Sequence, residues 1–225
     1  MLLGQVIKKI NKKFKKIKFN GIKFNSKECK PNDIFFAIKG SKFNGEKYID
    51  NAIKNGAKII ISSIKFEGLN KNNVLFIYNK NPRKLLSEIS SKIYKLKPNN
   101  IIAVTGTNGK TSVANFYQQI LSLNNRKVAS LGTLGISSEK FNLKTSNTTL
   151  DPISIHKTLQ KLKKLKIENV ILEASSHGLK QHRLNNIKFK TALFTNLSRD
   201  HLDYHKNVKD YLNSKLILFN KLLIP

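Results

Sequence analysis

The sequence has 225 residues and a formal net charge of +29, from 42 Lys and Arg against 13 Asp and Glu. A chain of this length can bury two small cores, so we expect two domains. A single cysteine, Cys29, excludes an intramolecular disulfide, and the paired lysines of the first 16 residues exclude a signal peptide or a membrane span there. We therefore expect a cytoplasmic, monomeric protein without a membrane partner.

The positive charge on its own favours a nucleic acid or another polyanion as partner. The lysines, however, are spread along the whole chain together with many Asn and Ile residues, which is typical of a genome rich in A and T codons. They form no single stripe with interleaved aromatic residues. Nucleic-acid binding is therefore the minority interpretation, and we expect no nucleic acid as partner.

The first hundred residues alternate short strand patterns with helical ones. Apolar residues at helical spacing predict an amphipathic helix within residues 1–16, carried by Leu3, Val6, Ile7, Ile10 and Phe14. Strands are predicted at 33–38, 58–62 and 74–78, and helices at 48–55 and 82–94. This pattern predicts a small α/β domain over residues 1–97, with its linker at 95–100.

A phosphate loop is predicted at residues 105–111, Thr-Gly-Thr-Asn-Gly-Lys-Thr, between a β-branched run and a helix over 112–123. Glycines let backbone N–H groups close on an anion, the helix N-terminus adds partial positive charge, and the Thr111 hydroxyl suits Mg²⁺. Only two residues separate Gly106 from Gly109, so the loop is a shortened variant of the usual P-loop. The alternative, a tight turn with an exposed lysine, is disfavoured by the order of strand, glycines, Lys and Thr.

The remaining residues, 98–225, alternate strands and helices, which predicts a doubly wound, mostly parallel sheet. Strands are predicted at 127–130, 169–172 and 191–195, helices at 153–166 and 208–218, a flexible segment at 132–135 and a surface loop at 140–150. Ligands of such sheets bind at the carboxyl ends of the strands, where the phosphate loop, Glu173 and Asn196 are all expected. The chain stops in an apolar segment, so we expect a truncated domain.

The sequence around Glu173 allows two interpretations of this residue. It can hold Mg²⁺ near nucleotide phosphates, or it can be an exposed residue before a helix that Ser175 or Ser176 caps. The nearby phosphate loop favours the metal. The run Asp200-His201-Leu202-Asp203-Tyr204-His205 could bind zinc through two histidines, but it lacks a cysteine partner or the His-Glu-x-x-His spacing. A polar loop beside a nucleotide site is the more economical interpretation.

Three further candidates are weaker. A Ser-His hydrolase at His177 lacks the Gly-x-Ser-x-Gly elbow. Gln181 and Arg183 offer an amide and a guanidinium that suit anionic oxygens, although many surface residues of these types bind nothing. Lys215, by its own pattern, is one lysine among many.

Four motifs follow one another along the chain. They are Thr105-Gly-Thr-Asn-Gly-Lys-Thr111, Asn147-Thr-Thr149, Glu173-Ala-Ser-Ser-His-Gly-Leu179 with Gln181-His-Arg183, and Phe194-Thr-Asn-Leu-Ser-Arg-Asp-His-Leu-Asp-Tyr-His205. Together they resemble the Mur ligases, and among these the MurE type, the UDP-N-acetylmuramoyl-tripeptide synthetases. The first hundred residues resemble the UDP-binding domain of the same enzymes through Asn25-Ser26-Lys27, Asp33-Ile-Phe-Phe-Ala37 and Gly40-Ser-Lys-Phe-Asn-Gly45.

The resemblance implies an ATP- and Mg²⁺-dependent ligase of peptidoglycan synthesis, and hence a role in cell-wall biogenesis, cell shape and cell division. Such enzymes add meso-diaminopimelate or L-lysine to UDP-N-acetylmuramoyl-L-alanyl-D-glutamate, whose carboxylate ATP converts to an acyl phosphate that the amine attacks. Residues 1–97 would bind the UDP substrate and 98–225 would form an incomplete ATP-binding domain. The family's C-terminal domain, which carries the adenosine contacts and the amino-acid pocket, is missing, so we expect this piece alone not to complete the ligation.

The resemblance also implies roles for single residues. The residues that would bind the ATP phosphates are Gly106, Thr107, Asn108, Gly109, Lys110, Thr111 and Ser112. The residues that would bind Mg²⁺ are Thr111, Glu173, His201 and Lys215. The residues that would bind the UDP substrate are Phe24, Ser26, Ser41, Lys42, Phe43, Asn147, Thr148, Thr149, Ser175, Gln181 and Arg183. Lys110, His201 and Lys215 would be catalytic, with Lys215 carbamylated by CO₂.

Three positions depart from the family pattern. Asn25-Ser26-Lys27 stands where the family has Asp-Ser-Arg, and Lys is not equivalent to Arg at a bidentate contact. Leu150 stands where proline or glycine is common. The alternatives within the same chemistry are another Mur ligase or a folylpolyglutamate synthase, and both are disfavoured by Asn147-Thr-Thr149 together with Ser-Ser-His-Gly-Leu-x-Gln-x-Arg.

Overall fold

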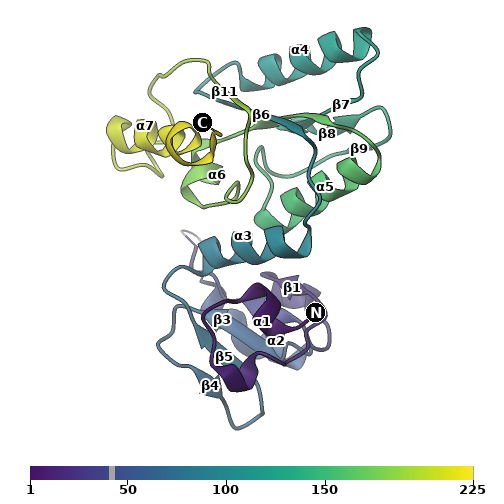
Figure 1. Ribbon diagram of the computed structural model, residues 1–225. Coiled ribbons are helices and arrows are strands. Elements are labelled where there is room, and N and C mark those ends of the chain that lie inside the picture. Colours follow the sequence, from purple (N-terminus) through teal and green to yellow (C-terminus); the bar gives the residue numbers. More distant parts are fainter. Residues whose placement is uncertain (41–43, 225) are drawn as a thin grey trace. The chain divides into compact units, whose positions relative to one another are not determined.

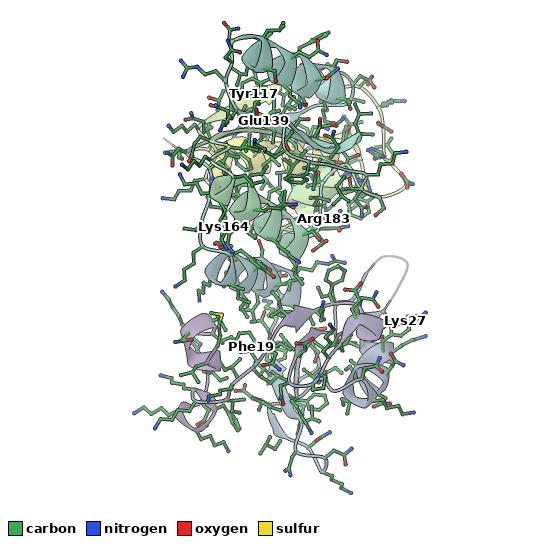
Figure 2. All side chains as sticks on the ribbon, turned by 90° about the vertical axis from the view of Figure 1, so that its right-hand side faces the viewer. Phe19, Lys27, Tyr117, Glu139, Lys164 and Arg183 are labelled. Atoms are coloured by element: carbon green, nitrogen blue, oxygen red, sulfur yellow. The ribbon has the colours of Figure 1, made fainter. Side chains whose placement is uncertain are left out.

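The computed structural model describes residues 1–40 and 44–224, and it divides into two compact units, Met1–Ile93 and Tyr94–Pro225 (Figure 1). Each unit has its own mostly parallel sheet, which confirms the predicted α/β fold class. Nitrogen-tipped side chains project from the surface of both units in Figure 2, so the positive charge is dispersed. Every helix within the described ranges is too short or too polar to span a lipid bilayer.

The first unit is built on a five-stranded sheet. Its elements are α1 (Leu3–Val6), β1 (Ile22–Lys23), β2 (Ile34–Phe36), α2 (Ile49–Lys54), β3 (Ile59–Ser62), β4 (Gly68–Leu69), β5 (Leu75–Tyr78) and α3 (Pro82–Ile93). The strand order is β1-β2-β3-β5-β4, with only β4 antiparallel to its neighbour. The central strands β2 and β3 are buried along their whole length, which explains their continuous apolar runs.

The predicted amphipathic helix over residues 1–16 is wrong in extent. Only Leu3–Val6 is α-helical, and a single 3₁₀ turn follows at Lys12–Phe14. The segment folds back on itself, because the N–H groups of Leu3 and Gly4 donate to the carbonyl oxygens of Ile17 and Lys15 at 2.9 and 3.0 Å. Most apolar residues of the pattern are nevertheless buried, so the periodicity reported burial and not one continuous helix.

The second unit is a six-stranded sheet with helices on both faces. Its elements are β6 (Asn100–Thr105), α4 (Lys110–Leu123), β7 (Val128–Gly132), β8 (Gly135–Ser138), β9 (Asn142–Leu143), α5 (Pro152–Lys164), β10 (Asn169–Glu173), α6 (Ser176–Lys180), β11 (Thr191–Phe194) and α7 (Val208–Ile217). The strand order is β11-β6-β10-β7-β8-β9, with β11, β6, β10 and β7 parallel. Figure 1 shows α4 on one face of this sheet and α5 on the other.

The alternation of side chains along β6 explains these two layers. Ile101 and Ala103 join the large core that includes the buried face of α5, whereas Val104 packs with Ala114 of α4. The strand is therefore buried on both faces, as its continuous apolar run from Ile101 to Val104 predicts. Its carboxyl end opens directly into the phosphate loop.

Two segments predicted as irregular belong to an antiparallel extension of this sheet. The segment 132–135 is the turn between β7 and β8, in which Gly132 pairs with Gly135 and Gly135 has φ +97°. The loop at 140–150 contains the short strand β9, which pairs with β8. Neither strand carries a long apolar pattern, and both residues of β9 are exposed.

Candidate nucleotide-binding site

The phosphate loop connects β6 to α4 as the sequence predicts. Gly109 has φ +82° and caps α4 at its N-terminus, and Gly106 has φ +146°. A Cβ atom on Gly106 would lie 1.9 Å from Thr195 Oγ1, so both the backbone conformation and the close approach require glycine here. The free N–H groups of the first turn of α4 thus face the loop, where an anion can bind.

The segment that follows β11 holds the loop in place. The N–H groups of Thr107 and Asn108 donate to the carbonyl oxygen and to Oδ1 of Asn196, both at 3.0 Å. Ser198 N–H donates to Thr107 Oγ1 at 3.0 Å, and the Thr195 hydroxyl donates to the Asn108 carbonyl oxygen at 2.6 Å. Hydrogen bonds from its own side chains and from residues 195–198, which follow β11, therefore hold the loop in one conformation.

Two lysines converge on the carbonyl oxygen of Gly106. Lys110 Nζ donates to it at 2.9 Å and to the Thr107 carbonyl oxygen at 2.7 Å, and Lys215 Nζ donates to it at 2.6 Å. Lys215 is 1 % exposed and lies over the ring of Tyr211, with Nζ 4.2 Å from the centroid. In the described part of the chain neither ammonium has a carboxylate within ion-pair distance.

The surroundings lower the pKa of both amines. Burial, and then the positive charge of Lys110, lower the pKa of Lys215 to about 8. Burial lowers the pKa of Lys110 as well, and the carboxylates of Glu173 and Asp200 oppose this shift. Two crowded cations without counter-ions form a strong site for an anion such as a phosphate.

Glu173 ends β10 beside the loop and is 2 % exposed, which excludes the interpretation of an exposed residue. Its Oε1 accepts from Thr133 N–H at 3.0 Å, and its Oε2 accepts from the hydroxyls of Thr111 and Thr133, both at 3.0 Å. Oxygen atoms of three side chains thus lie together at the Glu173 carboxylate, and oxygen ligands are those that Mg²⁺ prefers. The side chains present fit a divalent cation next to the phosphate site.

A cleft of about 250 Å³ unites these groups. Its lining contains the whole predicted set for the ATP phosphates, Gly106 to Ser112, together with Thr148, Glu173, Ser175, His201 and Lys215. Three lining residues, Thr133, Ser176 and Tyr211, are not among the predicted site residues. Tyr211 donates from its hydroxyl to Thr107 Oγ1 at 3.2 Å, so it ties α7 to the phosphate loop.

The three residues that the sequence did not predict carry weak signals. Thr133 lies in a segment that looks like a flexible glycine-bounded turn, and Ser176 looks like a helix cap. Tyr211 precedes Lys215 by one helical turn, and this i, i+4 spacing was the available signal for a shared face of α7.

Other predicted site residues lie beside the cleft, and they hydrogen-bond to its lining residues Glu173 and Ser175 or to one another. Thr149 is buried, and its hydroxyl donates to the Glu173 carbonyl oxygen at 2.8 Å. Ser175 caps α6, and its N–H donates to Thr149 Oγ1 at 2.9 Å. Arg183 donates to the Thr149 carbonyl oxygen at 2.7 Å and to Gln181 Oε1 at 2.8 Å, and Asn147 is exposed. The two residues predicted to bind anionic oxygens therefore also bind each other.

The histidines do not form a metal cluster. His177 stacks on Tyr204 with ring centroids 4.0 Å apart, and His201 is exposed at the rim of the cleft. His205 is buried between Ser176 and Ser214. Among residues 1–40 and 44–224, no three His, Cys, Asp or Glu side chains converge as a metal site would require, which disfavours the zinc interpretation.

The predicted uridine-binding residues belong to the first unit. Ser26 is buried in a 3₁₀ turn that Asn25 caps through its side chain, and Phe24 is 44 % exposed. Ser41, Lys42 and Phe43 lie outside the described residues. An exposed aromatic ring next to a rigid turn is available for stacking with a planar base.

Comparison with known proteins gives the same family for both units. Residues 104–224 match the Mur ligase middle domain, and residues 18–94 match the Mur ligase family, catalytic domain. The UDP-N-acetylmuramoyl-L-alanyl-D-glutamate--2,6-diaminopimelate ligase of Wigglesworthia glossinidia brevipalpis is 44 % identical over 217 residues, which are 92 % of this chain and 43 % of the relative. The ligase of the same name from Rickettsia prowazekii is 41 % identical over 96 % of this chain and 45 % of the relative.

Solved structures agree with the sequence matches. A structure of a UDP-N-acetylmuramoyl-L-alanyl-D-glutamate--2,6-diaminopimelate ligase superposes with a TM-score of 0.83 and 29 % identity over 99 % of this chain and 46 % of the other. The MurF ligase from Thermotoga maritima in complex with ADP has the same fold, with a TM-score of 0.58 and 23 % identity over 88 % of this chain and 42 % of the other. The chain spans less than half the length of the curated relatives it matches. Because one family description alone covers more than half of it, this chain belongs to the Mur ligase family.

Proposed function

We propose that this chain supplies the nucleotide-activating and UDP-substrate-binding parts of a MurE-type ligase. The ligase joins meso-diaminopimelate, or L-lysine, to UDP-N-acetylmuramoyl-L-alanyl-D-glutamate with hydrolysis of ATP. The observation that carries the proposal is the convergence of Lys110 and Lys215 on Gly106 beside the hydrogen-bonded carboxylate of Glu173. The curated relatives with that activity in their names support the choice of substrate.

The geometry suits phosphoryl transfer to a carboxylate. The N–H groups of the loop and of the first turn of α4 would bind the phosphates, and Lys110 would neutralise charge on the group that is transferred. The product of this step is an acyl phosphate, in which the carboxylate oxygen has replaced ADP on phosphorus. The amine of the incoming amino acid then attacks the carbonyl carbon, and inorganic phosphate leaves as the amide forms.

Mg²⁺ belongs to the same proposal. Thr111 and Glu173 would hold it, with His201 at the rim of the cleft and Lys215 in its carbamylated form as further candidates. The ion would withdraw charge from the phosphate oxygens and orient them. Since Thr133 hydrogen-bonds both oxygens of Glu173, it would keep this carboxylate turned toward Thr111.

Lys215 is suited to react with CO₂. A pKa of about 8 leaves part of this amine neutral near physiological pH, and the neutral amine is the form that attacks CO₂. Attack of the amine on CO₂ would form an N–C bond and release one proton, and the resulting carbamate would carry a negative charge, so it could neutralise Lys110 and bind a cation. The Mur ligase resemblance is the ground for expecting this modification.

The polar network around Thr149 would receive the muramoyl-peptide part of the substrate. Thr148 and Ser175 line the cleft directly, while Arg183 and Gln181 position the backbone of Thr149. Residues 1–97, with Phe24 and Ser26, would bind the uridine end. A monomeric state and a cytoplasmic location belong to the same proposal. The buried, unpaired thiol of Cys29 supports the location, since it suits a reducing compartment.

Calorimetry on the purified chain tests the binding part of the proposal. We expect saturable binding of Mg·ADP and, separately, of UDP-N-acetylmuramoyl-L-alanyl-D-glutamate, with Lys110→Ala weakening only the first.

The ligation is measured in a hybrid that joins this chain to the remaining part of the Wigglesworthia relative. Turnover with folate and glutamate, but not with the UDP-muramoyl dipeptide, would contradict the assignment.

A further inference from the structure

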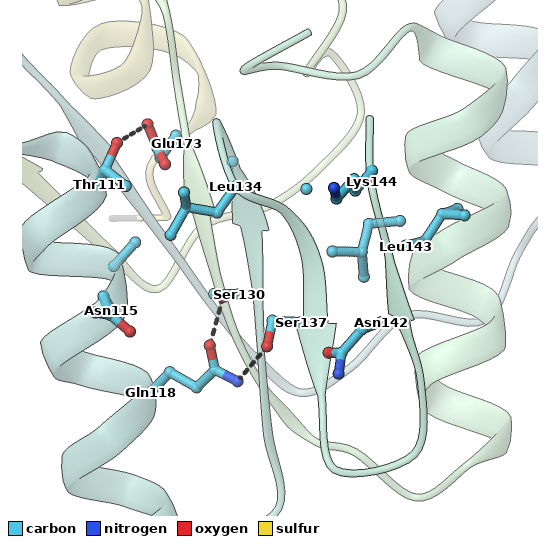
Figure 3. Close-up of a pocket in the computed structure, with 14 residues that line it drawn as sticks. Thr111, Asn115, Gln118, Ser130, Leu134, Ser137, Asn142, Leu143, Lys144 and Glu173 are labelled. Carbon is cyan, nitrogen blue, oxygen red and sulfur yellow. Dashed lines mark hydrogen bonds between the residues drawn. The ribbon is translucent and has the colours of Figure 1, made fainter. Parts of the chain in front are cut away.

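A second cavity, of about 460 Å³, lies between α4 and the antiparallel extension β7–β8–β9 (Figure 3). Its volume is in the range of sites for small organic molecules. It shares only Thr111 and Glu173 with the cleft at the phosphate loop, and the turn after β7 contributes Thr133 to the cleft and Leu134 to this cavity. The proposed ligase reaction uses none of its other residues.

The wall between the cavity and the core is a closed polar network. Gln118 of α4 accepts from the Ser130 hydroxyl at 2.6 Å and donates to Ser137 Oγ at 3.0 Å, as the dashed lines in Figure 3 show. One amide thereby links a helix to two strands. Because these groups satisfy one another, the wall keeps its shape without a ligand.

The rim offers one cation and two amide groups. Lys144 is exposed, and within the described residues its ammonium has no hydrogen bond or ion pair. Asn115 likewise has no side-chain hydrogen bond in that part of the chain, and the Asn142 side-chain oxygen accepts from Ser138 N–H at 3.2 Å, which leaves its NH₂ group to donate. The carboxylate of Glu173, which accepts hydrogen bonds from Thr111 and Thr133, lines the cavity at the other end from Lys144 (Figure 3), so an anion at Lys144 lies away from this negative charge.

The remaining wall is apolar. Leu134 and Leu143 flank the mouth with 71 % and 57 % of their surface exposed, and Ala114 and Ile136 are buried behind them. Exposed leucines on both sides of a concave site lose water contact when an apolar group enters. The cavity therefore combines apolar sides with donors of hydrogen bonds at its rim.

We propose that this cavity is a binding site for a small organic monoanion, a carboxylate on an aromatic or aliphatic body. The apolar body lies between Leu134 and Leu143, and the anionic group binds the ammonium of Lys144. A single ammonium matches one negative group, whereas a polyphosphate has its site at the phosphate loop. The site thus differs from the nucleotide cleft in the class of ligand that it takes.

The probe for the test is 6-fluoro-2-naphthoate, followed by ¹⁹F NMR on the purified chain. We expect saturable binding that excess pyrophosphate with Mg²⁺ does not displace and that Lys110→Ala does not change. The neutral amide of the same ring should bind about two- to fivefold more weakly, the effect of one exposed ion pair. Displacement by pyrophosphate would place the probe at the phosphate loop and overturn the proposal.

Variants locate the probe. Lys144→Gln should weaken naphthoate binding about two- to fivefold and leave the neutral amide unaffected, whereas Lys140→Gln in the same hairpin should change neither. Asn115→Trp, which fills the mouth from an exposed position of α4, should abolish saturable binding, and Leu143→Asp should do so independently.

Phe116 provides the remaining control. It is 59 % exposed on α4 outside the cavity, so Phe116→Ser should leave binding unchanged. Loss of binding in this variant, or full binding in both Asn115→Trp and Leu143→Asp with unaltered circular dichroism, would overturn the proposal.

Discussion

Lys110 and Lys215 share one acceptor, the carbonyl oxygen of Gly106, although they lie on different helices. Holding two ammonium groups this close costs free energy in the absence of an anion. Burial lowers the pKa of both amines, and the charge of Lys110 lowers the pKa of Lys215 further. That cost disappears when a polyphosphate enters. The phosphate loop is therefore suited to bind an anionic ligand.

Lys110→Ala should weaken the binding of Mg·ADP. A hydrogen bond to a charged group contributes about 1.5–3 kcal/mol, which corresponds to roughly a ten- to hundredfold increase in Kd. The Kd for UDP-N-acetylmuramoyl-L-alanyl-D-glutamate should change less than about twofold, because that substrate rests on other loops. Calorimetric titration of both ligands measures the difference, and equal losses would show that Lys110 does not act on the nucleotide alone.

Glu173→Gln should remove the Mg²⁺ dependence of nucleotide binding. Glutamine keeps a carbonyl oxygen for Thr133 N–H but loses the negative charge next to Thr111. We expect the Kd for ADP without Mg²⁺ to stay within about twofold of the unsubstituted chain, while the gain from added Mg²⁺ disappears. Thr148→Ala, on the same cleft but without a hydrogen bond to Glu173, is the matched control and should keep that gain.

The CO₂ adduct of Lys215 should depend on pH in a defined direction. Burial lowers the pKa of Lys215 to about 8 from a usual value of 10.5, so at pH 8 about half of its amine is neutral, compared with roughly one per cent or less for an exposed lysine. At constant dissolved ¹³CO₂, a carbamate signal should therefore rise through pH 8 and be absent from Lys215→Arg. A signal that appears only above about pH 10 would contradict the lowered pKa.

The strand, loop and helix of the phosphate site could be predicted because their signals are local: a β-branched run, two glycines and Lys-Thr lie close together in the sequence. The burial of Lys215 could not, because it depends on packing of α7 against a loop that lies far earlier in the chain. Thr133 could not be predicted for the same reason. Its role comes from the turn between two strands that only pair in the folded sheet.

Gly106→Ala should destabilise the second unit more than a positive φ angle alone would. Its added methyl group would overlap Thr195 Oγ1 at 1.9 Å, whereas a methyl group on Gly68, at φ +141°, would have nothing within 4 Å. Gly68→Ala thus isolates backbone strain. We expect Gly106→Ala to lower the free energy of unfolding, measured in urea, by about 1–3 kcal/mol more than Gly68→Ala does, which is the usual cost of overpacking. Equal losses in the two variants would mean that Thr195 moves away freely.

His205 should hold α6 against α7 through hydrogen bonds rather than through packing alone. The residue is 1 % exposed, its Nε2 lies 3.0 Å from Ser176 Oγ, and its Nδ1 lies 3.4 Å from Ser214 Oγ. His205→Leu should cost about 1–3 kcal/mol, because the buried hydroxyl of Ser176 loses its hydrogen-bond partner. His205→Gln, whose amide can reach Ser176, should recover part of that loss.

A double-mutant cycle separates the hydrogen bond from the change of volume at His205. In the Ser176→Ala background, the buried hydroxyl that His205→Leu would leave unpaired is absent. His205→Leu should therefore lower the free energy of unfolding less than it does in the unsubstituted chain. Urea denaturation of the four proteins gives the coupling energy, expected at about 0.5–3 kcal/mol. A coupling energy indistinguishable from zero would mean that the hydrogen bond to Ser176 contributes nothing, and it would leave the effect of His205 to its contact with Ser214 and to packing against Tyr211, whose ring centroid lies 5.1 Å away.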